Sequence, residues 1–189
     1  MKLKLFTALI CGISAFLLYA DNKVQSNVLF AEDFEAPAKG WVIRGGYAVK
    51  SEEGVKGSKG LSLVRPDAST PYTFCKYKVT GFKPGHKYRL SMMIRVDDLK
   101  YEGKTMPFKA VQVAGFDFYD NGKYLGSAYL PITVRNGNAG WKLYHRDFTV
   151  PGNVKEASVC FFLRKPYSCA RMTWDDIKVE EIGTADAAK

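Results

Sequence analysis

Residues 87–96, KYRLSMMIRV, carry the alternation that indicates the fold of this protein. Every second side chain from Tyr88 to Val96 is apolar, and the side chains between them include Arg89 and Arg95. A period of two is typical of a strand with one buried face in an antiparallel sheet. An amphipathic helix repeats its apolar positions every three or four residues, and that spacing is almost absent from this chain.

The segment 110–130, AVQVAGFDFYDNGKYLGSAYL, extends the same pattern to a pair of strands. Phe116 and Phe118 alternate with small or polar residues, and Asn121–Gly122 interrupts the alternation. Asn-Gly favours a two-residue hairpin turn because both residues accept positive φ. The segment therefore predicts a β-hairpin.

Seven more short segments have strand-like patterns bounded by turn residues. In chain order they are 27–34, 46–51, 60–65, 73–82, 141–150, 157–164 and 172–182. A total of about nine or ten closely spaced strands, without a convincing helix, predicts an all-β sandwich or barrel. Residues 97–110, DDLKYEGKTMPFKA, are too polar and irregular for a strand and predict a long connection that acts as a binding loop.

Residues 1–20, MKLKLFTALICGISAFLLYA, have the features of a secretory signal peptide. Lys2 and Lys4 precede an apolar stretch that runs from Leu5 to Leu18. This stretch is short for an uncleaved membrane anchor, which needs ~20 apolar residues. We therefore expect the peptide to be removed from a secreted, periplasmic or cell-surface protein, and no later stretch is apolar enough to span a membrane.

Removal of the signal peptide leaves one domain, residues 21–183, and a tail, residues 184–189, that we expect to be flexible. The full chain has 28 basic and 19 acidic residues and a formal charge of +9. Two lysines leave with the signal peptide, so the exported chain has a charge of about +7. This charge suits a polyanionic partner, but export disfavours nucleic acid.

Three cysteines remain after Cys11 leaves with the signal peptide: Cys75, Cys160 and Cys169. An odd number allows at most one disulfide and leaves one thiol free or paired with another chain. The sequence leaves open a bridge between Cys160 and Cys169, or between either of them and Cys75. There is no Cys-x-x-Cys and no cluster with the spacing of a zinc site.

Three marks occur in order along the chain. They are NVLFAEDFEAPAKGW at 27–41, KPGHKYRLSMMIRV at 83–96, and a Trp-led strand at 141–150 that is followed later by the tetrapeptide WDDI at 174–177. Together they resemble carbohydrate-binding modules of the galactose-binding-like, jelly-roll type, the group around families 4, 9 and 22. The resemblance covers nearly all of the chain after the signal peptide. It implies an all-β antiparallel jelly-roll sandwich with a concave face that often binds a glycan chain.

The resemblance also implies a structural calcium ion near the chain ends, held by acids from the first and last strands. The matching positions are Glu35 and either Asp175 or Asp176. Calcium prefers carboxylate and carbonyl oxygens in a flexible geometry, so these residue types suit it. The alternative is that the acids are exposed and only close a strand.

Glycan binding needs aromatic faces that stack on sugar rings and polar side chains that bond hydroxyl groups. Our candidate ligand-binding residues are Trp41, Tyr101 and Tyr129 as aromatics, and Arg89, Arg95 and Gln112 as polar contacts. Guanidinium groups at alternate positions suit a carboxylated or sulfated sugar. The alternative is that the arginines belong to an ordinary solvated strand face. We expect Trp141 and Trp174 to pack within the fold.

These observations predict a secreted, non-catalytic domain that captures a poly- or oligosaccharide, with an anionic one favoured by charge, on a concave sheet face. Enzyme signatures such as Gly-x-Ser-x-Gly and His-Glu-x-x-His are absent from the sequence. One alternative is a structural or protein-interaction module on the same fold. Another is a small jelly-roll polysaccharide lyase that uses Tyr144, His145 and Arg146 for proton transfer.

Overall fold

The computed structural model describes residues 27–67, 69–71, 74–103, 113–134, 136–163 and 166–184. The predicted signal peptide lies outside these ranges, as do Gln112 and residues 185–189 of the predicted tail. Within the described ranges, no helix has the length and apolar character needed to cross a membrane.

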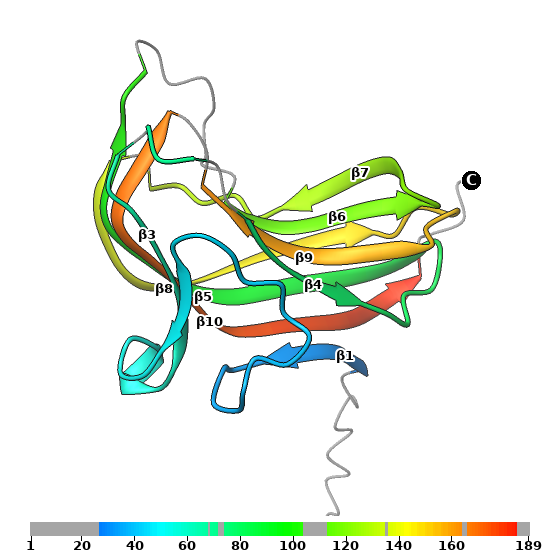
Figure 1. The fold of residues 1–189 in the computed structure, drawn as a ribbon. Helices are drawn as coiled ribbons and strands as arrows, with labels where there is room; N and C mark the ends of the chain where they lie inside the picture. The colour runs from blue at the N-terminus through cyan, green and yellow to red at the C-terminus, as the bar shows by residue number, and fades with distance from the viewer. Residues whose placement is uncertain are drawn as a thin grey trace, which may run out of the picture.

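The described chain consists of strands joined by turns and one short 3-10 helix, η1 (Val55–Gly57). The strands are β1 (Asn27–Glu32), β2 (Tyr47–Lys50), β3 (Gly60–Arg65), β4 (Phe74–Val79), β5 (His86–Tyr101), β6 (Ala114–Asp120), β7 (Lys123–Tyr129), β8 (Gly137–Thr149), β9 (Glu156–Phe162) and β10 (Tyr167–Thr184). One sheet has six strands in the order β2-β3-β10-β5-β8, with β1 paired to β10, and the other has four in the order β4-β9-β6-β7. All the pairings are antiparallel, and Figure 1 shows two layers, so the prediction of an all-β antiparallel sandwich is confirmed.

Strand β5 shows how the alternating sequence builds this sandwich. Its alternate residues from Tyr88 to Val96 are buried between the sheets, while Arg89 and Arg95 lie on the outer face. β5 pairs with β10 on one side and with β8 on the other, so both edges of its backbone are hydrogen-bonded. Its apolar face can therefore pack on the second sheet without leaving backbone polar groups unsatisfied.

The prediction of a loop at 97–110 is wrong for residues 97–101, because these five residues continue strand β5. Asp97 and Tyr101 pair with β10, whereas Leu99 pairs with β8 and has a buried side chain. Two long neighbouring strands stabilise an extended backbone here, although the polar side chains alone favour a loop. Residues 104–110 lie outside the described part of the chain.

The predicted hairpin is formed by β6 and β7, which pair directly. Asn121 and Gly122 connect them and have φ angles of 46° and 83°. Both residues thus adopt the left-handed backbone that the Asn-Gly sequence favours. The hairpin prediction is confirmed.

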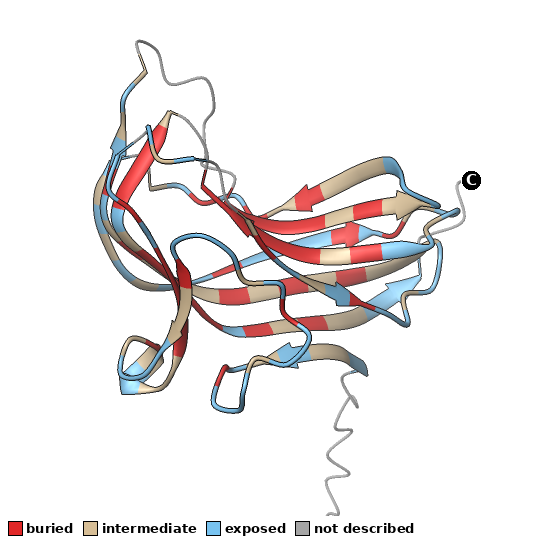
Figure 2. Cartoon of the chain, in the orientation of Figure 1, coloured by how far each residue is buried: buried red, intermediate tan, exposed pale blue. Residues whose placement is uncertain are grey.

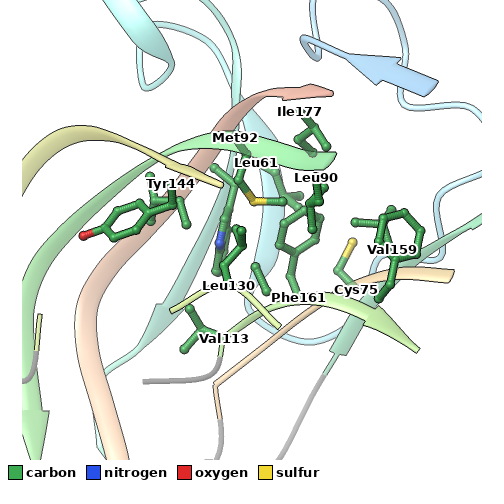
Figure 3. Packing of buried hydrophobic residues seen from close by; sticks show 14 of the residues in the cluster. Leu61, Cys75, Leu90, Met92, Val113, Leu130, Tyr144, Val159, Phe161 and Ile177 are labelled. Carbon is green, nitrogen blue, oxygen red and sulfur yellow. The ribbon is translucent and has the colours of Figure 1, made fainter. Parts of the chain in front are cut away.

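The core lies between the two sheets and is rich in aromatic rings. Trp174 of β10 is fully buried, with its ring centroid 5.0 Å from that of Phe161 of β9. Figure 2 shows buried residues along both layers, and Figure 3 shows Leu90 and Met92 of β5 beside Phe161. The expected packing of Trp174 is therefore confirmed, whereas Trp141 is half-buried on β8 and is not part of the core cluster.

The three described cysteines are buried and free, so none of the bridges left open by the sequence is present among them. Cys75 of β4 belongs to the core, whereas Cys160 of the neighbouring strand β9 lines a surface pocket. Burial raises the pKa of Cys75 to about 12 and that of Cys169 to about 11. These thiols are therefore held in their neutral form.

Candidate functional site

A pocket of about 280 Å³ opens on the face of the four-stranded sheet that points away from the core. All four strands contribute to its lining, which consists of Phe74, Lys76, Asp117, Tyr119, Tyr129, Ser158, Cys160 and Phe162. These side chains point away from the core because they alternate with core residues, as Asp117 does between Phe116 and Phe118. Figure 1 shows β5, β8 and β10 of the other layer bending past one end of this sheet.

Cross-strand pairing places the polar residues of the pocket side by side. Asp117 of β6 lies opposite Ser158 of β9. In the next row, Cys160 of β9 lies opposite both Gly115 of β6 and Lys76 of β4. The carboxylate of Asp117 and the ammonium group of Lys76 therefore come from neighbouring rows of the same sheet face.

The ring of Tyr129 covers part of this face. It lies over Gly115, where an added Cβ would be 2.5 Å from Cδ1 of Tyr129. The ring meets Phe162 edge to face, with the centroids 5.1 Å apart. Its hydroxyl donates a hydrogen bond of 2.6 Å to Oδ1 of Asp117. Burial and then this bond to the carboxylate raise the pKa of Tyr129, so the phenol stays protonated.

Cys160 is buried although it is not part of the core cluster. Its thiol donates across 3.5 Å to the backbone oxygen of Gly115 and, at the same distance, to Oδ2 of Asp117. Burial is the main cause of the raised pKa of Cys160, and the charge of Asp117 adds to it. Asp117 thus accepts from Tyr129 on one oxygen, and its other oxygen shares the single Cys160 proton with the backbone oxygen of Gly115.

Aromatic rings lie at both ends of this polar centre. Toward the hairpin, Tyr119 packs edge-on to Tyr124, with the centroids 5.7 Å apart. Toward the other end, Nζ of Lys76 lies 5.5 Å from the centroid of Phe74. The arrangement can stack flat rings on the apolar face of a ligand while Lys76 donates and Asp117 accepts hydrogen bonds.

Of the residues predicted to bind a ligand, the structure places Tyr129 in this pocket. Trp41 lies in the core instead, and its Nε1 donates a hydrogen bond of 2.8 Å to Glu32. Burying the indole with its N–H satisfied removes a large apolar area from water, which corrects the expectation of an exposed ring. Tyr101 ends β5 and packs on Tyr167, with the ring centroids 5.1 Å apart.

The two predicted arginines lie on the outer face of β5, in the sheet that does not form the pocket. Arg89 donates to both carboxylate oxygens of Asp147, at 2.6 and 2.8 Å. Arg95 donates to both oxygens of Asp97, at 3.2 and 2.8 Å. Their guanidinium groups are therefore already paired, and Gln112 lies outside the described residues.

The sequence interpretation misses Asp117, Tyr119, Lys76 and Phe74 as members of one site. The alternation at 114–119 carries part of the signal, because it places Asp117 and Tyr119 on the same face of a strand. No local pattern indicates that β4 and β9 lie beside that face. β9 is distant in sequence and pairs with β6, and β4 joins the site by pairing with the other edge of β9.

The residues considered for a lyase do not converge on one side of the sheet. Tyr144 is buried between the layers, whereas its neighbour His145 on β8 is exposed. Arg146 donates a hydrogen bond of 3.0 Å to the backbone oxygen of Tyr129. These positions do not assemble a base and a carboxylate-binding group around one substrate atom.

The acids predicted to bind calcium accept hydrogen bonds from the chain itself. Asp175 is buried, and its Oδ2 accepts from the backbone nitrogen of Val55 at 2.8 Å and from Oγ of Ser58 at 2.9 Å. Glu35 accepts a hydrogen bond of 2.5 Å from the backbone nitrogen of Lys59. Both carboxylates therefore have partners within the chain.

Asp176 lies beside an open hollow of about 520 Å³ between β1, the turn after it and β10. Burial is the main cause of the raised pKa of Asp176, and the nearby charges of Asp175 and Asp33 add to it. In the described part of the chain, no group of three or more His, Cys, Asp or Glu side chains could hold a metal ion. The described acidic side chains do not by themselves supply the three or more ligands of a calcium site. Calcium binding stays a prediction.

Comparison of folds finds the same architecture in several solved proteins. A structure of the CBM22-1 and GH10 modules of an endo-1,4-beta-D-xylanase from Clostridium thermocellum, complexed with xylohexaose, has a TM-score of 0.59 and 16% identity over 86% of this chain. The match covers 30% of that xylanase chain. The CBM22-1 xylan-binding domain from Paenibacillus barcinonensis has a TM-score of 0.57 and 15% identity, with 85% of this chain and 97% of that one covered.

The same fold also occurs in a protein that is described as a cyclase and not as a carbohydrate-binding module. A Stig cyclase from Fischerella sp. TAU has a TM-score of 0.53 and 8% identity, and the match covers 84% of this chain and 99% of the cyclase. Identities this low show a shared fold and leave function to other observations. No curated protein matches the chain.

The family comparison is more specific than the likeness of folds. The model of the family described as "Carbohydrate binding domain" matches residues 26–168, which is most of the chain. This match confirms the predicted resemblance to jelly-roll carbohydrate-binding modules and the expectation of a non-catalytic domain. The chain therefore belongs to this family of carbohydrate binding domains.

Proposed function

We propose that this domain captures a poly- or oligosaccharide in the pocket on the outer face of the four-stranded sheet. One observation carries the proposal: this face combines Tyr119 and Phe74 with the charged groups of Asp117 and Lys76 in a single pocket. Sugar rings have apolar faces that stack on aromatic side chains and hydroxyl groups that both donate and accept. The pocket offers a partner for each of these features.

We propose a neutral saccharide as the ligand. The sequence-based preference for an anionic sugar depends on Arg89 and Arg95, and both lie on the other sheet in pairs with aspartates. The charged residues that line the pocket are one aspartate and one lysine, so the lining has no excess of positive charge. The leader-like sequence at residues 1–20 supports an exported protein, secreted, periplasmic or at the cell surface.

Affinity gel electrophoresis tests the proposal directly. We expect the folded protein to be retarded in native gels that contain a neutral polysaccharide, with xylan and mixed-linkage β-glucan as the first probes. Xylan is chosen because the similar domain from Paenibacillus barcinonensis is described as xylan-binding. Gels with polygalacturonate provide the anionic comparison, and retardation there alone would contradict a neutral ligand.

Two variants locate the binding face. Tyr119→Ala removes a ring from the pocket, and we expect it to weaken binding about tenfold. Arg95→Ala is the matched control on the other sheet, where a partly exposed ion pair contributes little to stability, and we expect unchanged binding. If Arg95→Ala lost binding while Tyr119→Ala bound fully, the proposed pocket would be wrong and the binding site would lie on the six-stranded sheet.

A further inference from the structure

The carboxylate of Asp117 is the best-supported polar group in the pocket. It stands in the middle of the sheet, opposite Ser158, and its two oxygens accept from Tyr129 and Cys160. The tyrosine and the cysteine come from the strands on either side of β6. Donors that approach from both sides restrict the rotation of the carboxylate more than a single bond does.

We propose that Asp117 is a rigid acceptor for two adjacent hydroxyl groups of a neutral sugar, and that Tyr129 and Cys160 are positioning residues that hold it in place. The proposal rests on the proposed function and assigns roles within the same pocket. A carboxylate offers about four acceptor positions, so two remain after the protein donors are counted. Two neighbouring oxygens with one free position each suit two neighbouring hydroxyl donors.

The chemistry of the two positioning residues supports this division of roles. Burial and the Asp117 carboxylate both raise the pKa of Tyr129 and of Cys160, so each keeps its proton and remains a donor. Because the Tyr129 proton goes to Asp117 and the Cys160 proton is shared between Asp117 and the backbone oxygen of Gly115, the carboxylate is the group that faces the ligand as an acceptor. A ligand that lacks hydroxyl donors, or that adds its own negative charge there, loses these bonds.

The close approach of Tyr129 also depends on the strand beneath it. Gly115 leaves room for the ring, since an added Cβ would be 2.5 Å from both Cα and Cδ1 of Tyr129. The edge-to-face contact with Phe162 holds the ring from the side. The tyrosine hydroxyl is therefore directed at Asp117 by packing, which is what a positioning role requires.

Four variants test the proposal on whichever neutral polysaccharide retards the wild type. Asp117→Asn keeps the shape but loses the charge, and we expect binding at least about tenfold weaker. Tyr129→Phe and Cys160→Ala each remove one donor, and we expect losses of about threefold to tenfold. Cys160→Ser restores a donor and is expected to bind within about threefold of the wild type. Ser91→Ala removes a hydroxyl from the outer face of the six-stranded sheet and is the control.

A double-mutant cycle separates positioning from direct contact with the ligand. If Tyr129 acts through Asp117, Tyr129→Phe has no further effect in the Asp117→Asn background. Additive losses would show that the tyrosine hydroxyl bonds the ligand itself and would overturn its positioning role. Near-ultraviolet circular dichroism and thermal melting confirm that each variant is folded.

The outcomes distinguish this proposal from the proposed function. If the folded wild type binds none of the neutral polysaccharides, the function itself is wrong. If the wild type binds and Asp117→Asn binds equally well, glycan binding stands and the acceptor role of Asp117 is wrong. If Cys160→Ser binds as weakly as Cys160→Ala, a hydrogen-bond donor at this position does not support binding, and the positioning role of Cys160 is wrong.

Discussion

Asp175 shows at the scale of one residue how a buried carboxylate can join distant segments. Its Oδ2 accepts from Val55 and Ser58, and its Oδ1 accepts from the backbone nitrogen of Asp176. The bond to Val55 connects positions 120 residues apart, so it ties η1 to the last strand. A carboxylate removed from water needs such compensation, and three donors supply it here.

Replacing Asp175 by Asn is expected to lower the free energy of unfolding by about 1–3 kcal/mol. The amide loses the negative charge and places a donor against existing donors. Urea denaturation measures the difference. Asp33→Asn is the control, because the hydrogen bond that Asp33 accepts from the backbone nitrogen of Glu35 is exposed. We expect its free energy of unfolding to change by no more than about 0.5 kcal/mol. A loss from Asp175→Asn no larger than the control would contradict this account.

The same residue offers a check of the calcium prediction. A metal ion that binds the folded state raises the melting temperature by mass action. If calcium binds near Asp175, thermal melting of the wild type should occur at a higher temperature with calcium than with a chelator. Equal melting temperatures would contradict the prediction and leave Val55, Ser58 and Asp176 as the partners of the carboxylate.

At the scale of elements, the hairpin of β6 and β7 forms one half of the pocket and β4 and β9 form the other. The alternation within β6 was predictable, because Phe116 and Phe118 are apolar and their neighbours are not. The close contact of β6 with the ring of Tyr129 requires Gly115, whose small size gives no strand signal. Local patterns therefore predict the strands better than the surface that they share.

Replacing Gly115 by Ala is expected to destabilise the protein by about 1–3 kcal/mol and to weaken glycan binding. The added Cβ would lie 2.4 Å from the backbone oxygen of Ala128 and 2.5 Å from Cα of Tyr129, so β6 and β7 would have to separate. Gly140→Ala on β8 is the matched control, since its Cβ meets nothing within 4 Å. Urea denaturation of both variants checks the prediction, and equal stabilities would contradict it.

At the scale of the whole molecule, the sandwich encloses its cysteines without bridging them. Cys75 lies in the core beneath the four-stranded sheet, and Cys160 lies on the other side of that sheet. Side chains that point to opposite faces of a sheet cannot meet in a disulfide of normal geometry. Stability of the described domain therefore comes from its packed core of aromatic and aliphatic side chains.

We expect the thiols of the folded protein to react at least about a hundredfold more slowly than those of the unfolded chain with a chromogenic disulfide reagent at pH 8. Burial raises the pKa of Cys75 to about 12 and that of Cys169 to about 11, so the reactive thiolate is scarce. In denaturant, a chain that begins at residue 21 should yield three thiols. Fewer than three, or a melting temperature lowered by reductant, would reveal a disulfide.

The sequence by itself determined the fold class and the family of this protein. The order of the marks from 27–41 onward can be recognised along a single chain and indicates the family, whereas alternation in β5 and the Asn121–Gly122 turn depend on neighbouring residues. The alternation and the turn each report local geometry. For that reason the antiparallel sandwich and the hairpin were predictable.

Only the tertiary structure decided where the candidate site lies. Strand pairing placed Asp117 beside Cys160 and Lys76 on one sheet face, buried Trp41, and put Arg89 in the other layer. Alternation shows that a strand has two faces, but not which sheet the strand joins or which strands flank it. The sheet that a strand joins and the neighbours that flank it depend on how the apolar faces of all the strands are buried together. No short segment of sequence contains that information.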